Sequence, residues 1–186
     1  MQKRKDWNGL ITGFKASDLV FLDESGCNTD MTRRYAYSLG GSRAVDSAPL
    51  SKPKNTTILS SIQLDGTLHY TTFSGGTTVE RFKRYLETDL LPHLNGDSIL
   101  IMDNMKSHHA KAVKNLLDSS GVRYIYLPSY SPDLNPIEKL WSKVKAFLRK
   151  FKARTLDALP NAIQRAFQNV SPSNCSGWFR SCGYAL

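Results

Sequence analysis

Apolar and polar positions follow a strand-like pattern through the first half of the chain. The run Asp18-Leu-Val-Phe-Leu-Asp23 is short, apolar and closed by an acid, which is typical of a buried strand. A second strand is predicted at 34–38, just ahead of two glycines. Segments 55–64 and 67–73 flank Asp65-Gly66, a dipeptide that strongly favours a type I′ turn, so they predict a β-hairpin.

From residue 75 the apolar positions recur at helical spacing, with two more short strands between the helices. A capping-box pattern at 77–80 opens the first helix, and Ser107 is placed to cap the second. The predicted elements are a helix at 77–92, a strand at 98–103, a helix at 107–120, a strand at 122–127, a helix from 136 and an amphipathic segment at 156–170. Trp141 lies on the apolar stripe of the helix from 136, which favours core packing for its side chain.

The order of these elements predicts an α/β fold. An antiparallel meander followed by crossover units implies one mixed sheet, with antiparallel and parallel strands, flanked by helices. The sheet would fill one compact domain, since 186 residues of which 40% are hydrophobic can bury a substantial core.

The composition of the chain predicts the kind of partner and the cellular compartment. The net charge of +9 suggests a polyanionic partner such as nucleic acid. No apolar run is long enough to span a membrane, and the first ten residues lack the apolar centre of a signal peptide. Three widely spaced cysteines favour reduced thiols over a zinc site or a disulfide framework. We therefore expect a soluble, cytoplasmic protein without a membrane partner.

Three acids occupy positions that suggest a metal site. Asp23 and Asp103 end apolar strands, and Glu138 opens the helix that follows the last strand. Carboxylates at the ends of neighbouring parallel strands meet in one crevice, where their mutual repulsion favours a bound cation. Oxygen ligands select Mg²⁺ or Mn²⁺, and a pair of such ions supports phosphodiester cleavage. The alternative is that these acids merely finish strands and offset a helix dipole.

The segment before Glu138 is built to be rigid. Pro132 and Pro136 restrict the backbone, while Asp133 and Asn135 can form side-chain turns or cap the helix. Pro136 suits the first helical position. Together these residues would hold Glu138 in the first turn of the helix, although an ordinary rigid loop is the alternative explanation.

Three segments resemble the catalytic blocks of a known family. FLDESG, MDNMKSHHA and LPSYSPDLNPIEKLWSKVK are similar to the three blocks of DDE transposases of the mariner superfamily, particularly its bacterial insertion-sequence branch. The resemblance implies a ribonuclease-H-like fold, with Asp23, Asp103 and Glu138 as catalytic ligands of two Mg²⁺ ions, for which Mn²⁺ can substitute. It also divides the chain into an N-terminal linker remnant at 1–17, a catalytic domain at 18–152 and a C-terminal helical extension at 153–186.

The family activity would be metal-dependent DNA strand cleavage and 3′-hydroxyl strand transfer at the ends of an insertion sequence. Partners would be element ends and target DNA, a second copy in an active homodimer, and a separate or upstream helix-turn-helix module, since only 22 residues precede Asp23. Such a protein would act in the cytoplasm at the nucleoid. Two other classes stay open: a catalytically inert DNA-binding or multimerisation module that regulates an intact transposase, and a nuclease without strand transfer.

Several neighbouring residues receive supporting roles. Asn104 is predicted to support Asp103 by hydrogen bonding, with an ordinary turn residue as the alternative, and His108 is expected near the scissile phosphate or in a supporting position. Glu24 is left out of the metal site, because strand alternation points it to the other face. The residues Lys145, Arg149 and Lys152 are predicted to bind DNA, as a basic track that leads away from Glu138 along one helix face.

Overall fold

One mixed sheet forms the centre of the molecule. The computed structural model describes residues 2–33, 35–47, 49–50 and 53–184. Its strands are β1 (Leu19–Cys27), β2 (Thr56–Ile62), β3 (Leu68–Ser74), β4 (Ile99–Met102) and β5 (Arg123–Tyr126). They lie in the order β3-β2-β1-β4-β5, with β1 antiparallel to β2 and parallel to β4. The predicted mixed sheet flanked by helices is confirmed, and its order is that of a ribonuclease-H-like fold.

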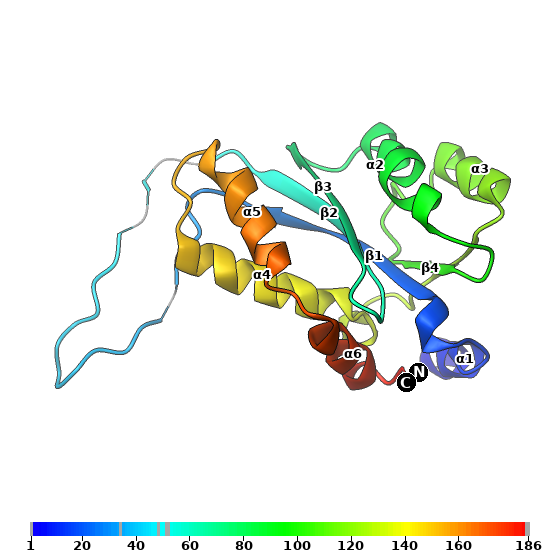
Figure 1. Cartoon of the computed structure of the whole chain (residues 1–186), viewed down its shortest axis with the longest axis horizontal. Helices are drawn as coiled ribbons and strands as arrows, with labels where there is room; N and C mark the ends of the chain where they lie inside the picture. Colours follow the sequence, from blue (N-terminus) through cyan, green and yellow to red (C-terminus); the bar gives the residue numbers. More distant parts are fainter. Residues whose placement is uncertain (1, 34, 48, 51–52, 185–186) are drawn as a thin grey trace.

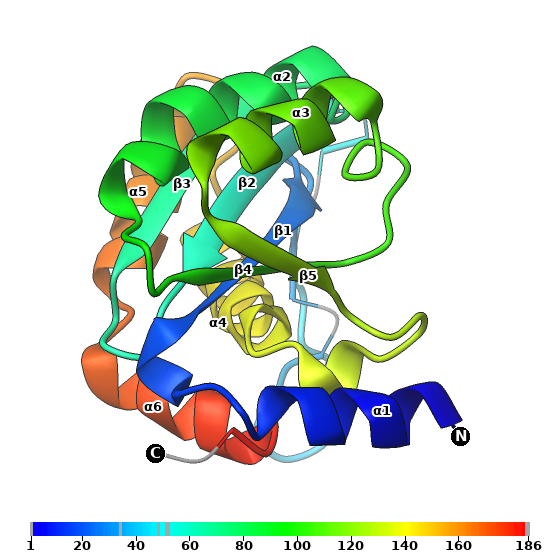
Figure 2. The same cartoon turned by 90° about the vertical axis from the view of Figure 1, so that its right-hand side faces the viewer.

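Helices cover both faces of this sheet (Figure 2). One layer contains α4 (Ile137–Phe151), α5 (Ala158–Gln168) and α6 (Pro172–Ser181). The other layer contains α2 (Val79–Tyr85) and α3 (Lys111–Ser120), and a π-helical turn at Leu86–Leu90 extends α2. Alternation along β1 supplies both cores, because Phe21 packs in the cluster of the α4 layer and Leu22 in the cluster of the α2 layer.

The segment before the sheet is also ordered. Residues Gln2–Ile11 form helix α1, and a short 3-10 turn at Ala16–Asp18 leads into β1. Trp7 on α1 is buried in the core cluster of the α4 layer. The division of the chain into a linker remnant, a catalytic domain and a helical extension stays a prediction. No helix in the described ranges is long and apolar enough to cross a membrane.

The predicted hairpin is present, but its turn differs from the expected type. A type I′ turn needs positive φ at both central residues, whereas Gly66 has φ +95° and Asp65 is not among the residues with positive φ. Gly66 N instead donates to Gln63 O, and Asp65 Oδ1 accepts from Thr67 N. The connection is therefore a three-residue loop with glycine at its left-handed position.

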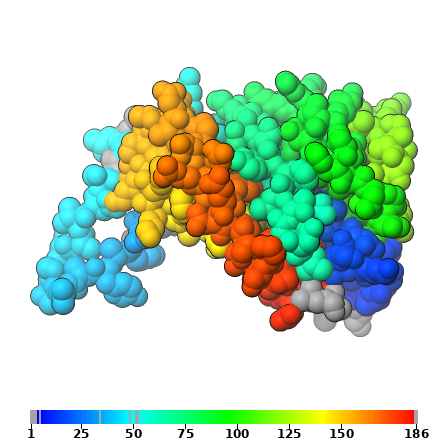
Figure 3. All heavy atoms as spheres, in the orientation of Figure 1, coloured from blue at the N-terminus to red at the C-terminus, as the bar shows by residue number. Residues whose placement is uncertain are grey.

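The strand predicted at 34–38 was wrong for residues 35–38, and Arg34 lies outside the described residues. The chain between β1 and β2 projects away from the body (Figures 1 and 3). Tyr35 and Tyr37 are 90% and 106% exposed there. The free edges of the sheet are β3 and β5, and residues 35–38 pair with neither of them, so their alternating aromatic positions form no strand.

Two predicted helix caps shift along the chain. Thr78, not Thr77, caps α2, where its side chain accepts from Arg81 N. The helix predicted from Ser107 begins only at Lys111, after Ala110 at the cap position. Ser107 is instead buried, and its hydroxyl has no partner among the described residues. Residues 103–110 thus form a loop, which leaves room for the side chains of the candidate site.

Candidate metal and nucleic-acid site

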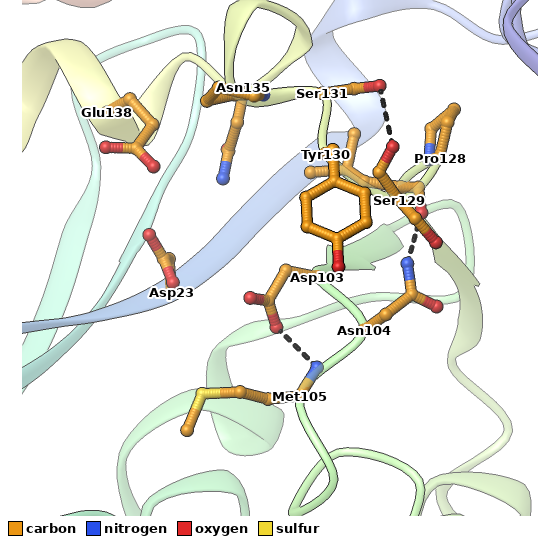
Figure 4. Close-up of a pocket in the computed structure, with 12 residues that line it drawn as sticks. Asp23, Asp103, Asn104, Met105, Pro128, Ser129, Tyr130, Ser131, Asn135 and Glu138 are labelled. Atoms are coloured by element: carbon orange, nitrogen blue, oxygen red, sulfur yellow. Dashed lines mark hydrogen bonds between the residues drawn. The ribbon is translucent and has the colours of Figure 1, made fainter.

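The three predicted acids line one cavity of about 510 Å³. Asp23 comes from β1, Asp103 follows β4, and Glu138 lies in the first turn of α4. Parallel pairing of Leu22 with Met102 places the next residues, Asp23 and Asp103, side by side. Asp103 follows the end of β4, but the prediction that Asp23 ends its strand was wrong, because β1 continues to Cys27 in antiparallel pairing with β2. Figure 4 shows the three carboxylates directed into the same space.

Asp23 is held from one side by an aromatic side chain. Trp141 Nε1 donates a hydrogen bond to Asp23 Oδ2 at 3.0 Å, and both residues are buried. Burial raises the pKa of Asp23 to about 7, although hydrogen bonds from the Glu24 backbone and from Trp141 oppose the rise. Trp141 therefore has a contact beyond the core packing that its apolar stripe predicts. The nearby charges of Glu24 and Asp103 add to the rise.

Asp103 is held through its Oδ1 atom. That oxygen accepts from Met105 N at 2.9 Å and lies 2.9 Å from His108 Nδ1. Burial acts to raise the pKa of Asp103, but the hydrogen bonds from His108 and Met105 outweigh it and hold the pKa below its ordinary value. Asp103 is thus ionised at neutral pH.

A buried ionic pair supports Asp103 from behind. His108 is fully buried, stacks on Phe82 with ring centroids 4.3 Å apart, and brings Nε2 within 3.2 Å of Glu24 Oε1. Burial alone would lower the pKa of His108, but hydrogen bonds to Asp103 and Glu24 raise it to about 10. The ring therefore bridges two carboxylates as an imidazolium.

Glu24 is the functional candidate that sequence reasoning missed. Alternation along β1 does send Glu24 away from Asp23, but His108 in the 103–110 loop reaches the same side. Two features of the sequence could have suggested this contact. Glu24 directly follows Asp23, and His108 follows Asp103 by five positions. Only the fold shows that these side chains meet.

Asn104 does not support Asp103 in the predicted way. Its Nδ2 donates to Leu127 O, and its Oδ1 faces His109 Nε2 at 3.3 Å. Asn104 thereby ties the loop after β4 to the end of β5, so the alternative of a turn residue holds. The residue still lines the cavity, next to Met105.

The rigid segment before Glu138 forms the wall of the cavity opposite the strands. Pro132–Leu134 is a 3-10 turn, and Asn135 is buried with its carbonyl oxygen accepting from Glu138 N at 3.2 Å. Pro136 takes the cap position of α4 instead of the predicted first helical position. Tyr130 lines the cavity fully exposed, with an unusual φ of 57°.

The predicted basic track divides into two parts. Lys145 and Arg149 are half-buried and line a second hollow of about 330 Å³ with residues 26–28 and 30–32. Lys152 is the left-handed C-cap of α4 with φ 56° and forms an ion pair with Asp46. The three cations therefore do not continue as one stripe, because the helix ends before Lys152 and that residue turns to another partner.

The donor atoms of the three acids decide which cations the site could hold. In the described part of the chain, no three His, Cys, Asp or Glu side chains converge tightly enough to hold a metal ion. The donor chemistry nevertheless fits Mg²⁺ or Mn²⁺, because Asp23, Asp103 and Glu138 offer only oxygen. The raised pKa of Asp23 also fits, since a nearby cation would restore its ionised form.

Comparisons with known proteins show the family and the fold. A family model described as DDE superfamily endonuclease matches residues 18–160. The Transposable element Tc1 transposase of Caenorhabditis elegans is 26% identical over 120 residues, which cover 56% of this chain and 44% of that protein. This chain thus spans less than half of that curated relative.

Two solved structures share the fold. A pre-cleavage Mos1 transpososome matches with a TM-score of 0.81 and 19% identity over 97% of this chain and 58% of the other. A Mos1 mariner paired end complex with Mn matches with a TM-score of 0.80 and 20% identity over 96% of this chain and 57% of the other. At these identities the likeness concerns the fold alone.

Proposed function

Because the chain belongs to the DDE superfamily endonucleases, we propose that it is a transposase catalytic domain that cuts DNA strands at insertion-sequence ends and joins the freed 3′ hydroxyl to target DNA. The observation that carries this proposal is the cavity in which Asp23, Asp103 and Glu138 meet from three separate elements. Three acids this far apart in sequence have no common structural task at that place other than a shared ligand.

Asp23, Asp103 and Glu138 would hold two Mg²⁺ ions, with Mn²⁺ as a substitute. Bound there, the ions would activate a water or hydroxyl nucleophile and stabilise the leaving oxygen of a phosphodiester. The Mos1 paired end complex with Mn supports the choice of metal.

The protein's own contribution is to orient the acids. Trp141 Nε1 engages Oδ2 of Asp23, while His108 and Met105 N engage Oδ1 of Asp103. Among the hydrogen bonds of the described residues, Oδ2 of Asp103 accepts none, and it is the atom free for a cation. Rigid placement of this kind is what a catalytic metal site requires.

We assign the partners on the same basis. The substrates would be element ends and target DNA, the active form a homodimer, and specificity would come from a helix-turn-helix module on a separate or upstream segment. The pre-cleavage Mos1 transpososome supports a DNA-bound assembly. The protein would act in the cytoplasm at the nucleoid.

A joining assay tests this function against its two alternatives. The chain, fused to a helix-turn-helix module from the same element, is given pre-cleaved 3′ ends and supercoiled target DNA with Mg²⁺. A transposase yields joined products, which Asp103→Asn abolishes. Nicking without joining would show a simple nuclease, and DNA binding without either product would show an inert regulatory module.

A further inference from the structure

The hollow beside Lys145 and Arg149 has the composition of an anion site. Both side chains lie on one face of α4, four residues apart, against the segment that continues β1. Neither forms an ion pair with any described carboxylate within 4.0 Å. Their charged groups are therefore available to an anion from outside the chain.

The charge of this hollow fits one phosphodiester. Asp30 is the single acid in its lining, so the ionised groups sum to one positive charge. A phosphodiester carries one negative charge, whereas a free phosphate carries up to two. The net charge therefore matches the DNA backbone better than inorganic phosphate.

A neutral group completes the lining. Asn28 lies in the wall, and its Oδ1 is buried with no partner among the described residues. An amide oxygen can only accept a hydrogen bond, so it would not contact an anion. The NH₂ group of Asn28 would supply the donor to an anion held between the two cations.

The hollow also lies at a useful distance from the acids. Along α4, Lys145 and Arg149 follow Glu138 by about 10 and 16 Å, at roughly 1.5 Å per residue. A phosphate in the hollow would therefore lie a few nucleotides from the bond at the acids.

We propose that Lys145, Arg149 and Asn28 form one pocket for a single backbone phosphate of the DNA strand that crosses the acidic cavity. This proposal rests on the proposed function, because it takes DNA as the ligand. The sequence predicted a basic track in which each cation would contact DNA separately. In the proposed pocket, Lys145 and Arg149 instead share one phosphate. It also excludes Lys152, which is engaged by Asp46.

Salt dependence separates one shared site from two independent contacts. Binding of a fluorescent 30-bp duplex is measured by anisotropy over a range of NaCl concentrations. Each phosphate neutralised contributes about 0.9 to the slope of log affinity against log salt. The double variant Lys145→Ala with Arg149→Ala should therefore reduce the slope by about 0.9, whereas independent contacts would reduce it by about 1.8.

Three further variants sharpen the test. Asn28→Ala should weaken binding severalfold without changing the slope, and Asp30→Asn should strengthen binding. Lys150→Ala, next to Arg149 on the helix but outside this hollow, is the matched control and should keep the wild-type slope. Thermal unfolding shows that each variant is folded.

Failure of this proposal is distinguishable from failure of the proposed function. A slope reduced by about 1.8, an unchanged slope, or a wild-type chain that does not bind the duplex would overturn the pocket. Wild-type binding with the predicted slopes but no metal-dependent cleavage would leave the pocket standing and overturn the enzymatic function alone.

Discussion

Trp141 Nε1 donates a 3.0 Å hydrogen bond to Oδ2 of Asp23, between two side chains that are only 3% and 9% exposed. The bond joins α4 to β1 across 118 positions of sequence. It fixes the helix that begins beside Glu138 against the strand that carries Asp23. Packing of the core and placement of the two acids therefore depend on the same side chain.

Trp141→Phe should weaken both metal binding and the fold. The substitution keeps an aromatic ring in the core but removes the donor to Asp23, for an expected loss of about 1–3 kcal/mol of unfolding free energy. Loss of an orienting hydrogen bond lowers metal affinity by about 10–100-fold. Mn²⁺ titration checks this, with Trp7→Phe in the same core cluster as control. Equal affinities in the two variants would contradict the orienting role.

Asp23 should make stability depend on pH in metal-free protein. Its folded pKa of about 7 exceeds the ordinary 3.8, so the folded state binds more protons between these values. Stability should therefore fall as pH rises from about 4 to about 7, by at most about 4 kcal/mol. Denaturant unfolding with chelator should show that Asp23→Asn removes this fall. If the unfolding free energy of the wild type depended on pH in the same way as that of Asp23→Asn, Asp23 would not have the raised pKa.

Glu24 and His108 should be energetically coupled. The pair is buried, so removal of one partner leaves the other charge uncompensated. A double-mutant cycle with Glu24→Gln and His108→Gln should give a coupling of about 0.5–3 kcal/mol in unfolding free energy. The folded pKa of His108, about 10, is above the usual 6.5. Its stabilising contribution is therefore complete below about pH 6.5 and is lost as pH rises through 10. Additive effects of the two substitutions at pH 6 would disprove the pair.

Gly66→Ala should lower the stability of the protein more than the same substitution at Gly121, another glycine with positive φ. Gly66 has φ +95°, and an added Cβ would lie 3.0 Å from Cα of Pro172 at the start of α6. Gly121 has φ +73° but open space around it. Left-handed strain alone accounts for about 1–2 kcal/mol, which Gly121→Ala should show. Thermal unfolding should give a lower Tm for Gly66→Ala than for Gly121→Ala. A lower Tm for Gly121→Ala would contradict the contact between residue 66 and Pro172.

The elements that the sequence predicted well have local signals. Turn residues at Asp65-Gly66 and uninterrupted apolar runs such as 98–103 predicted strands that the structure contains. The failure at 35–38 has a physical cause, because an alternating pattern does not show whether the segment reaches a sheet edge to pair with. Family membership was predictable as well, since the three blocks that suggested it lie within the matched range 18–160.

The supporting residues of the site were less predictable than its acids. Asp23, Asp103 and Glu138 could be recognised because each acid follows an apolar run or opens a helix, which is visible from neighbours in sequence. Asp23 ends only the apolar run, since β1 itself continues to Cys27. The contacts of Trp141 with Asp23 and of Glu24 with His108 depend on elements 118 and 84 residues apart. Hydrophobic periodicity contains no information on such pairs.

The central claim is that Asp23, Asp103 and Glu138 act together with a divalent metal to cut DNA. The most direct measurement is nicking of supercoiled DNA in Mg²⁺ by the wild-type chain and by Asp23→Asn, Asp103→Asn and Glu138→Gln. We predict nicking by the wild type that chelator abolishes and Mn²⁺ restores, and background nicking by each variant at unchanged DNA affinity. Nicking that persists in any of the three variants, or in the presence of chelator, would contradict the account.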